Sequence, residues 1–246
     1  MKEQAFFNWS GGKDSALALY KVKHSNQYNI QCLLTNINSV YDRVSMHGVR
    51  RSLMEAQVAS IGLPLVTAEL PEEPSMHDYE TIMANKLNTL KASGCSKAIF
   101  GDIFLEDLKI YREQKLKEVG IECVFPLWKM DTTILIKEFI NLGFKAVIVC
   151  VNETYLDKSF CGRLIDASFV NDLPSNVDVC GENGEFHSFV FDGPIFKKPV
   201  QFKKGEVVYK QYEAPETNET NAQTKYGFWF CDLLPADLLK LKATDA

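Results

Sequence analysis

The sequence predicts an α/β fold in which a mostly parallel sheet carries helices on both faces, followed by a smaller C-terminal α+β lobe. Over the first 150 residues, apolar segments rich in β-forming residues alternate with segments of helical period. After about residue 152, the pattern changes to short strand-like pieces punctuated by Gly, Pro and Asn. We therefore expect one domain over residues 1–152 and a second lobe over residues 153–246.

Apolar spacing and helix-boundary residues predict the elements of the first domain. Apolar residues three and four apart predict helices across 79–90 and 105–119. Ser75 and Asp78 have capping-box spacing before the first of these helices, and Asp131 fits the N-cap of a later one. Periodic stretches end at Gly62, Gly94, Gly120 and Gly143. Helical crossovers favour a parallel sheet built from six β-prone segments, near residues 5–9, 30–35, 64–68, 97–101, 122–126 and 146–151.

The second lobe has a different composition. Residues 153–173 are partly helical in pattern, and residues 213–225 are polar and predict a loop. Four short segments predict strands, namely His187–Phe191, Pro199–Phe202, Val207–Tyr212 and Gly227–Cys231.

Composition excludes several classes of protein. The 246 residues are 46% hydrophobic and 24% charged, which is an ordinary globular balance. No apolar run approaches the roughly 18 residues of a membrane span, and the N-terminus does not resemble a signal peptide, so we expect a cytoplasmic protein. A net charge of -5 without a basic cluster disfavours nucleic-acid binding. The seven cysteines include no C-x-x-C pair, so neither zinc nor a dithiol redox motif is expected.

A glycine-rich loop with polar side chains follows the first predicted strand and opens a helix. It comprises Ser10, Gly11, Gly12, Lys13, Asp14 and Ser15. Glycines let the backbone approach an anion, and N–H groups at a helix start attract phosphate. Lys13 adds positive charge, the two serines can donate hydrogen bonds, and Asp14 would hold Mg²⁺ or shape the loop. The spacing differs from a Walker A loop. The alternative is an ordinary glycine turn.

A second polar cluster, Cys180–His187, contains the sequence Gly-Glu-Asn-Gly-Glu-Phe. It brings two carboxylates, Glu182 and Glu185, together with an amide and the imidazole of His187 around two glycines. Dense polar groups on a flexible backbone indicate a site. A polar turn before the next strand is an equal alternative.

The first loop resembles the SGGxDS signature of PP-loop ATP pyrophosphatases. With Gly101-Asp102-Ile103, Pro126-Leu127-Trp128, Gly162-Arg163-x-x-Asp166 and GENGEF following in order, residues 5–200 resemble the diphthine–ammonia ligase family. The resemblance implies an adenine nucleotide α-hydrolase-like domain. It also implies ATP-dependent amidation of diphthine on elongation factor 2, with release of AMP and pyrophosphate. The stretch FGDIFLEDLKIYRE looks like the bacterial branch of the family, in which the acceptor can differ.

This chemistry predicts roles for named residues. ATP, Mg²⁺, ammonium and a protein acceptor would be the reactants and cofactors. Loop amides, Lys13 and an Mg²⁺ ion on Asp14 would stabilise the departing pyrophosphate. Glu182 and Glu185 would then orient ammonium and accept its proton. Two other functions compete with this one: a PP-loop enzyme acting on another acceptor, such as a sulfur-transfer or tRNA-modifying enzyme, and a non-catalytic ATP or AMP sensor.

Further candidates lie at the predicted carboxyl edge of the sheet, where open α/β sheets bind ligands. Candidates for the nucleotide are Thr35, Asn36, Ile37, His47, Gly101 and Asp102. Candidates for the acceptor are Trp128, Arg112, Phe186 and His187. Phe104, Tyr111, Trp128 and Phe186 are the aromatic candidates for a trimethylammonium group, and Trp128 is the strongest of them. The alternatives are a surface role for His47, snorkelling of Arg112 and core positions for the aromatic residues. Arg163 and Asp166 are expected to pair with each other.

Overall fold

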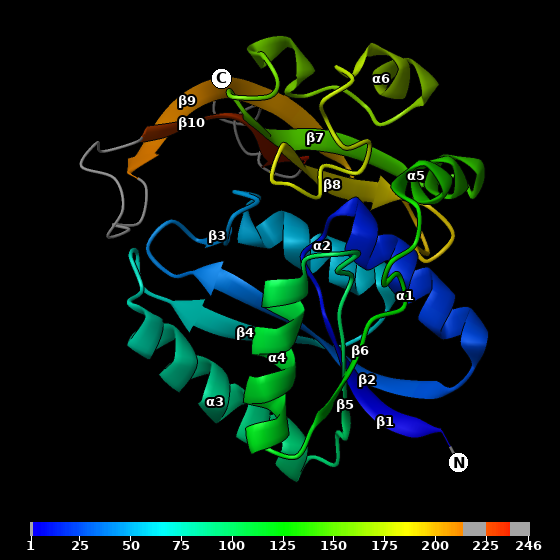
Figure 1. Ribbon diagram of the computed structural model, residues 1–246, viewed down its shortest axis with the longest axis vertical. Helices are drawn as coiled ribbons and strands as arrows, with labels where there is room; N and C mark the ends of the chain where they lie inside the picture. The colour runs from blue at the N-terminus through cyan, green and yellow to red at the C-terminus, as the bar shows by residue number, and fades with distance from the viewer. Residues whose placement is uncertain (1, 214–224, 237–246) are drawn as a thin grey trace, which may run out of the picture.

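The computed structural model describes residues 2–213 and 225–236, which form two sheets (Figure 1). The first sheet has the order β3-β2-β1-β5-β6, and β4 pairs with β2. Its strands are β1 (Glu3–Asn8), β2 (Tyr28–Asn38), β3 (Arg43–Val44), β4 (Leu65–Leu70), β5 (Lys97–Ile99) and β6 (Glu122–Val124). These strands pair in parallel, except that β2 and β3 pair antiparallel. The predicted mostly parallel sheet is therefore confirmed.

Helices cover both faces of this sheet, as predicted. Helices α1 (Lys13–Ser25) and α2 (Arg51–Ile61) lie between the two sheets (Figure 1) and share one core with the second sheet. Helices α3 (Met76–Ala92) and α4 (Glu106–Glu118) contribute to a separate core on the opposite face. The Ser75–Asp78 capping box and the Asp131 N-cap of α5 (Thr132–Asn141) are both present.

The chain order creates a crevice beside β1. From β1 the chain runs through α1 to β2 on one side, and after β4 it crosses through α3 to β5 on the other side. The strand order thus reverses at β1 and β5, where open α/β sheets bind ligands at the carboxyl ends of their strands.

The sixth predicted strand belongs to the second sheet. β7 (Lys145–Asn152) pairs antiparallel with β8 (Phe186–Asp192) and β10 (Lys225–Pro235), so the prediction that it joins the parallel sheet is wrong. Its apolar run indicates burial on both faces, and burial alone specifies neither the partner nor the direction of pairing. The second sheet has the order β8-β7-β10-β9, with β9 at Phe202–Glu213. The division at residue 152 stays a prediction.

The rest of the second lobe follows the sequence pattern in part. A 3-10 turn (Lys158–Phe160) and α6 (Ala167–Asp172) account for the partly helical stretch. Three of the four predicted strands lie in β8, β9 and β10, whereas Pro199–Phe202 is not a strand before Phe202. Most of the predicted 213–225 loop lies outside the described residues. Among the helices that the structure describes, none is both long and apolar enough to span a bilayer.

Candidate active site

A cavity of about 1140 Å³ opens where the strand order reverses. The loop after β1, the end of β2, the residues after β5, the loop before β8 and one side of both α3 and α4 line it. Most of the predicted site residues meet there, namely Ser10, Gly12, Lys13, Asp14, Ser15, Thr35, Asn36, His47, Gly101, Asp102, Arg112, Glu182, Phe186 and His187. The residues predicted from the sequence thus lie together around one cavity, and their roles stay predictions.

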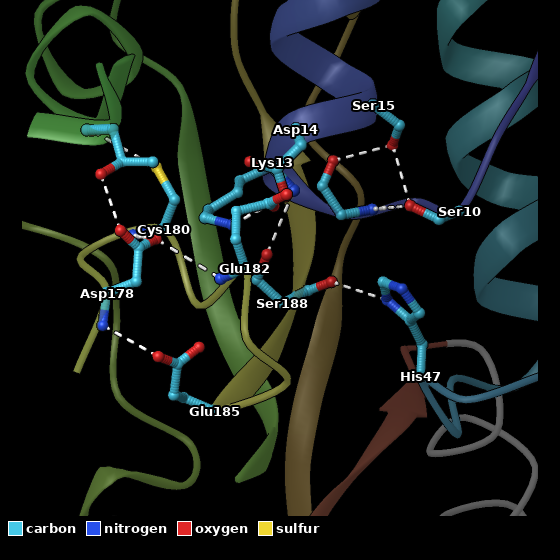
Figure 2. A network of polar contacts seen from close by, with 12 residues as sticks. Ser10, Lys13, Asp14, Ser15, His47, Asp178, Cys180, Glu182, Glu185 and Ser188 are labelled. Carbon is cyan, nitrogen blue, oxygen red and sulfur yellow. Dashed lines mark hydrogen bonds and ion pairs between the residues drawn. The ribbon is translucent and has the colours of Figure 1, made fainter. Parts of the chain in front are cut away.

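The loop between β1 and α1 is folded by its own serines (Figure 2). The backbone N–H of Gly12 donates to Ser10 Oγ at 3.3 Å, and the two serine hydroxyls lie 3.1 Å apart. Ser15 Oγ donates to the Gly12 carbonyl at 2.9 Å. Gly12 caps α1 without a side chain of its own over the helix start. The N-terminus of α1 therefore faces the cavity, and the free backbone N–H groups of a helix N-terminus commonly bind anions.

Two glycines allow the loop to pack closely. Gly11 has a φ of 81°, which favours glycine. A Cβ atom added to Gly101 would lie only 2.9 Å from the backbone nitrogen of Ser15. The end of β5 and the start of α1 can therefore approach this closely only because position 101 has no side chain.

Anchors from two other elements hold the loop in place. Gln57 on α2 is fully buried, donates to the Gly11 carbonyl at 3.0 Å and accepts from Trp9 Nε1 at 3.1 Å. The backbone N–H of Val190 on β8 also donates to the Gly11 carbonyl, at 2.9 Å, and the N–H of Lys13 donates to Ser188 Oγ at 3.1 Å. Sequence analysis missed Gln57 and Ser188, although a glutamine among the apolar positions of a helix was an available signal.

Lys13 and Asp14 form an ion pair in the cavity wall, with 2.7 Å between Nζ and Oδ2. Lys13 is only 5% exposed, and burial by itself disfavours its charged form. The nearby carboxylates of Asp14 and Glu182 outweigh that penalty and raise the pKa of Lys13 above its usual value. Lys13 is therefore a fixed positive charge at the start of α1.

Asp102 and Arg112 form a second pair in the cavity, with 3.2 Å between Oδ2 and Nη1. The Arg112 guanidinium lies 4.3 Å from the centroid of the Phe100 ring. Asp102 Oδ2 is buried and has no hydrogen-bond partner among the described residues. Burial raises the pKa of Asp102, and Arg112 opposes that effect.

The two carboxylates of the second cluster have different environments. Glu185 is fully buried and accepts hydrogen bonds from the backbone N–H groups of Asp178 (2.9 Å) and Asn183 (2.8 Å), and from Asn183 Nδ2 (3.1 Å). Glu182 instead lines the cavity, where burial and the neighbouring charge of Asp14 raise its pKa to about 8. Glu185 thus holds the loop in shape and does not line the cavity. Its catalytic role stays a prediction.

His47 and His187 stack against each other in the cavity wall, with ring centroids 4.7 Å apart. His47 Nδ1 lies 3.3 Å from the Ser188 carbonyl oxygen (Figure 2). Burial lowers the pKa of His47 to about 4 and that of His187 to about 3. Both rings are therefore neutral at physiological pH.

Several predicted residues lie elsewhere. Ile37 is buried in the core, and Gly11 faces Gln57. Trp128 does not line the cavity; it packs on Phe125, with the Lys109 ammonium 5.2 Å from its ring centroid. Their predicted roles stay predictions.

The prediction that Arg163 pairs with Asp166 is wrong. Arg163 pairs with Asp172 at 2.7 Å. Asp166 has an extended backbone and caps α6 instead, by accepting a hydrogen bond from the N–H of Phe169 at 2.8 Å. A capping side chain folds back on its own helix, so it is not free to pair along the helix.

The cavity extends between α3 and α4 into a part where sequence analysis placed only Arg112 and, among the aromatic candidates, Tyr111. We call it the α3–α4 end; its main lining residues are Tyr79, Met83, Leu87, Leu108, Tyr111 and Leu116. Glu80 links the two helices, with 2.9 Å to Lys115 Nζ and 3.4 Å to the Tyr111 hydroxyl. Several of these residues belong to the apolar stripes that predicted the helices, and stripes ordinarily indicate core.

Comparison with known proteins places the chain in a family. Residues 1–123 match the model of the diphthamide synthase N-terminal domain, and residues 131–216 match that of the diphthamide synthase C-terminal domain. The diphthine–ammonia ligase of Homo sapiens is 29% identical over 119 residues, covering 46% of this chain and 45% of the relative. That of Danio rerio is 31% identical, covering 46% of this chain and 47% of the relative. The matched region thus spans less than half the length of these relatives.

A solved structure shows a weaker likeness. The U34-tRNA thiolase NcsA from Methanococcus maripaludis, solved with its 4Fe–4S cluster, is 18% identical, with a TM-score of 0.37 over 57% of each chain. The two domain models, by contrast, match most of the chain and follow one another in the family's order. The resemblance drawn from the motifs is confirmed, and the chain belongs to the diphthamide synthase family.

Proposed function

We propose that this protein is an ATP-dependent amide ligase, which adenylates a carboxylate, transfers ammonia to it and releases AMP and pyrophosphate. Diphthine on elongation factor 2 is the acceptor that the curated relatives' name suggests. One observation carries the proposal. A glycine-rich loop with a fixed lysine charge and a carboxyl group of raised pKa, Glu182, line the same cavity.

The phosphates of ATP would lie on the loop from Ser10 to Ser15. The start of α1 and the charge of Lys13 attract an anion there. Mg²⁺ fits the same place, because it takes one or two protein carboxylates together with phosphate oxygens. Asp14 and Asp102 would supply those carboxylates; Asp102 Oδ2 is buried, makes no hydrogen bond among the described residues and has the Arg112 guanidinium 3.2 Å away, so its environment already suits a cation. No group of three or more His, Cys, Asp or Glu side chains within the described residues is arranged to hold a metal alone.

The acceptor carboxylate would attack the α-phosphorus of ATP. The P–O bond to the β-phosphate breaks, pyrophosphate leaves, and the acceptor becomes a mixed anhydride with AMP. Donors fixed before the reaction stabilise the charge that develops on pyrophosphate. Lys13 and the loop are fixed in this way by Gln57, Ser188 and Val190.

Glu182 would serve the second half-reaction. Its raised pKa of about 8 lies close enough to that of ammonium for proton transfer near neutral pH. Ammonium gives one proton to the carboxylate, ammonia attacks the acyl carbon, and AMP leaves with the bonding electron pair. The positively charged nitrogen now bonded to the acyl carbon then loses its extra proton to water and leaves the neutral amide, so the step balances.

The α3–α4 end would receive the acceptor. The cavity volume of about 1140 Å³ exceeds the roughly 300–1,000 Å³ of a typical small-molecule pocket, so it suits two substrates. A trimethylammonium group binds aromatic faces, and Tyr79 and Tyr111 line this end. Tyr111 therefore becomes a better candidate than Trp128 for this contact.

Product analysis tests the proposal. The purified protein is incubated with ATP, Mg²⁺, a diphthine-bearing acceptor and either ammonium or glutamine. We expect AMP and pyrophosphate with ammonium alone. Accumulation of ADP would reject the assignment, and a requirement for glutamine would reject ammonium as the nitrogen donor. ATP binding without turnover on any acceptor would favour the sensor.

A further inference from the structure

The His47 ring lies directly over the start of the phosphate-binding helix. A Cβ atom added to Gly12, the N-cap of α1, would sit only 3.0 Å from His47 Cε1. His47 comes from the β3–α2 connection, far from α1 in sequence, and it lines the cavity beside the loop from Ser10 to Ser15. A phosphate bound at this helix start would therefore meet the edge of the imidazole.

The hydrogen bond that His47 makes fixes its tautomer. The Ser188 carbonyl oxygen, 3.3 Å from Nδ1, can only accept, so Nδ1 carries the proton. In the neutral ring, Nε2 then has a lone pair and no proton. Nε2 is bonded to Cε1, the ring atom nearest to Gly12. A phosphate oxygen is also only an acceptor, so a neutral His47 of this tautomer and a bound phosphate oxygen repel each other.

We propose that His47 takes up a proton at Nε2 when the pyrophosphoryl part of ATP binds, and gives it to pyrophosphate as that group leaves. This inference rests on the proposed function. On binding, one proton from solvent converts the imidazole to imidazolium, which donates to Ser188 through Nδ1 and to phosphate through Nε2. On departure, the N–H bond at Nε2 breaks, the proton goes to a pyrophosphate oxygen, and the ring returns to its neutral form.

The surroundings of His47 explain why the proton is absent before binding. Burial disfavours a positive charge on His47 most, and Lys13 on α1 adds to that effect, whereas the hydrogen bond to the Ser188 carbonyl favours the charge. The three arginines nearest to it in sequence are all paired, Arg43 and Arg50 with Asp232 on β10 and Arg51 with Asp42 and Glu69. An added phosphate supplies the missing negative charge next to the ring.

Proton magnetic resonance tests this directly, because the chain has only four histidines and therefore four Cε1–H signals. The His47 signal is assigned by its loss in His47→Gln. In the free protein, we expect it not to titrate between about pH 5 and pH 8. With saturating pyrophosphate or MgATP, we expect its midpoint to rise by about three pH units, into the neutral range.

The signals of two other histidines, His77 and His187, serve as internal controls. His77 lines the α3–α4 end of the cavity, and its signal should not change with ligand. If the His187 signal shifts instead of the His47 signal, the assignment of the proton is wrong. If ligand binds and His47 stays neutral, the inference fails while the proposed function stands. If neither ligand binds, the proposed function fails first.

Discussion

The two ends of the cavity are built differently. At the phosphate end, which we define as the loop from Ser10 to Ser15 with its anchors, buried hydrogen bonds from α2 and β8 fix the backbone. At the α3–α4 end, apolar and aromatic side chains from two helices line the space, and Glu80 joins those helices through surface contacts. The difference suits the proposed reaction. A charged transition state is stabilised by hydrogen-bond donors that are fixed in advance, whereas an apolar group is bound mainly by contact with apolar and aromatic side chains.

The largest expected effect comes from breaking the phosphate end. Asp14→Ala leaves the buried Lys13 ammonium without its partner and removes a proposed Mg²⁺ ligand. We expect turnover to fall by about 10²-fold or more, and Ser10→Ala to have a similar effect. Steady-state pyrophosphate release measures it. Glu138→Ala is the matched control, because it breaks the ion pair between Lys21 on α1 and Glu138 on α5, outside the cavity. Normal rates in both loop variants would remove this loop from the mechanism.

Glu182→Gln is expected to separate the two half-reactions. Amide formation should fall by about 10²-fold while ATP affinity is retained, because the amide cannot accept the ammonium proton. Since the carboxylate is the active form and its pKa is about 8, wild-type amide formation should increase with pH through that value. The variant should lose this dependence, and Glu113→Gln, on the exposed side of α4, should keep it. Loss of ATP binding in a folded Glu182→Gln protein would assign this residue to the nucleotide.

The same group makes stability depend on pH. The folded-state pKa of Glu182, about 8, lies above the usual 4.5, so the folded protein holds this proton more tightly than the unfolded chain. The free energy of unfolding should therefore fall as pH rises from 4.5 to 8. Urea denaturation across this range should show a smaller fall for Glu182→Gln than for the wild type.

Glu185→Gln should affect stability more than chemistry. Glu185 accepts hydrogen bonds from three N–H groups, and a glutamine would point its own donor at one or more of them. We expect a loss of about 1–3 kcal/mol in the free energy of unfolding, measured with urea. The loop would loosen without losing a reacting group. An unchanged stability with abolished amide formation would instead give Glu185 the catalytic role.

The smallest effect is expected at the α3–α4 end. Tyr111→Ala should raise the acceptor KM about 2- to 30-fold, the equivalent of about 0.5–2 kcal/mol, and leave the ATP KM unchanged. Tyr111→Phe should keep most of the affinity, since the ring remains. Trp128→Ala, outside the cavity, should change the acceptor KM less. The comparison uses trimethylated and unmethylated acceptors; equal use of both by the wild type would exclude an aromatic site for the cation.

The features that the sequence predicted correctly are those set by short stretches of the chain. The turn from β1 into α1, the Ser75 and Asp131 caps and the glycine helix stops each depend on residues within a few positions of one another, so a short stretch of sequence is enough to predict them. The carboxyl ends of the parallel strands then placed most of the nucleotide candidates in one cavity.

The sequence by itself therefore determined the fold class and the family, and it predicted the glycine-rich loop after β1. Only the tertiary structure decided that β7 joins the second sheet, that Glu182 and not Glu185 lines the cavity, and that Trp128 lies away from it. It also brought Gln57, Ser188 and His47 to the loop from distant segments. These contacts depend on which apolar faces pack against each other in the folded protein. The hydrophobic pattern of a segment predicts that one of its faces is buried, but it does not predict which other segment covers that face.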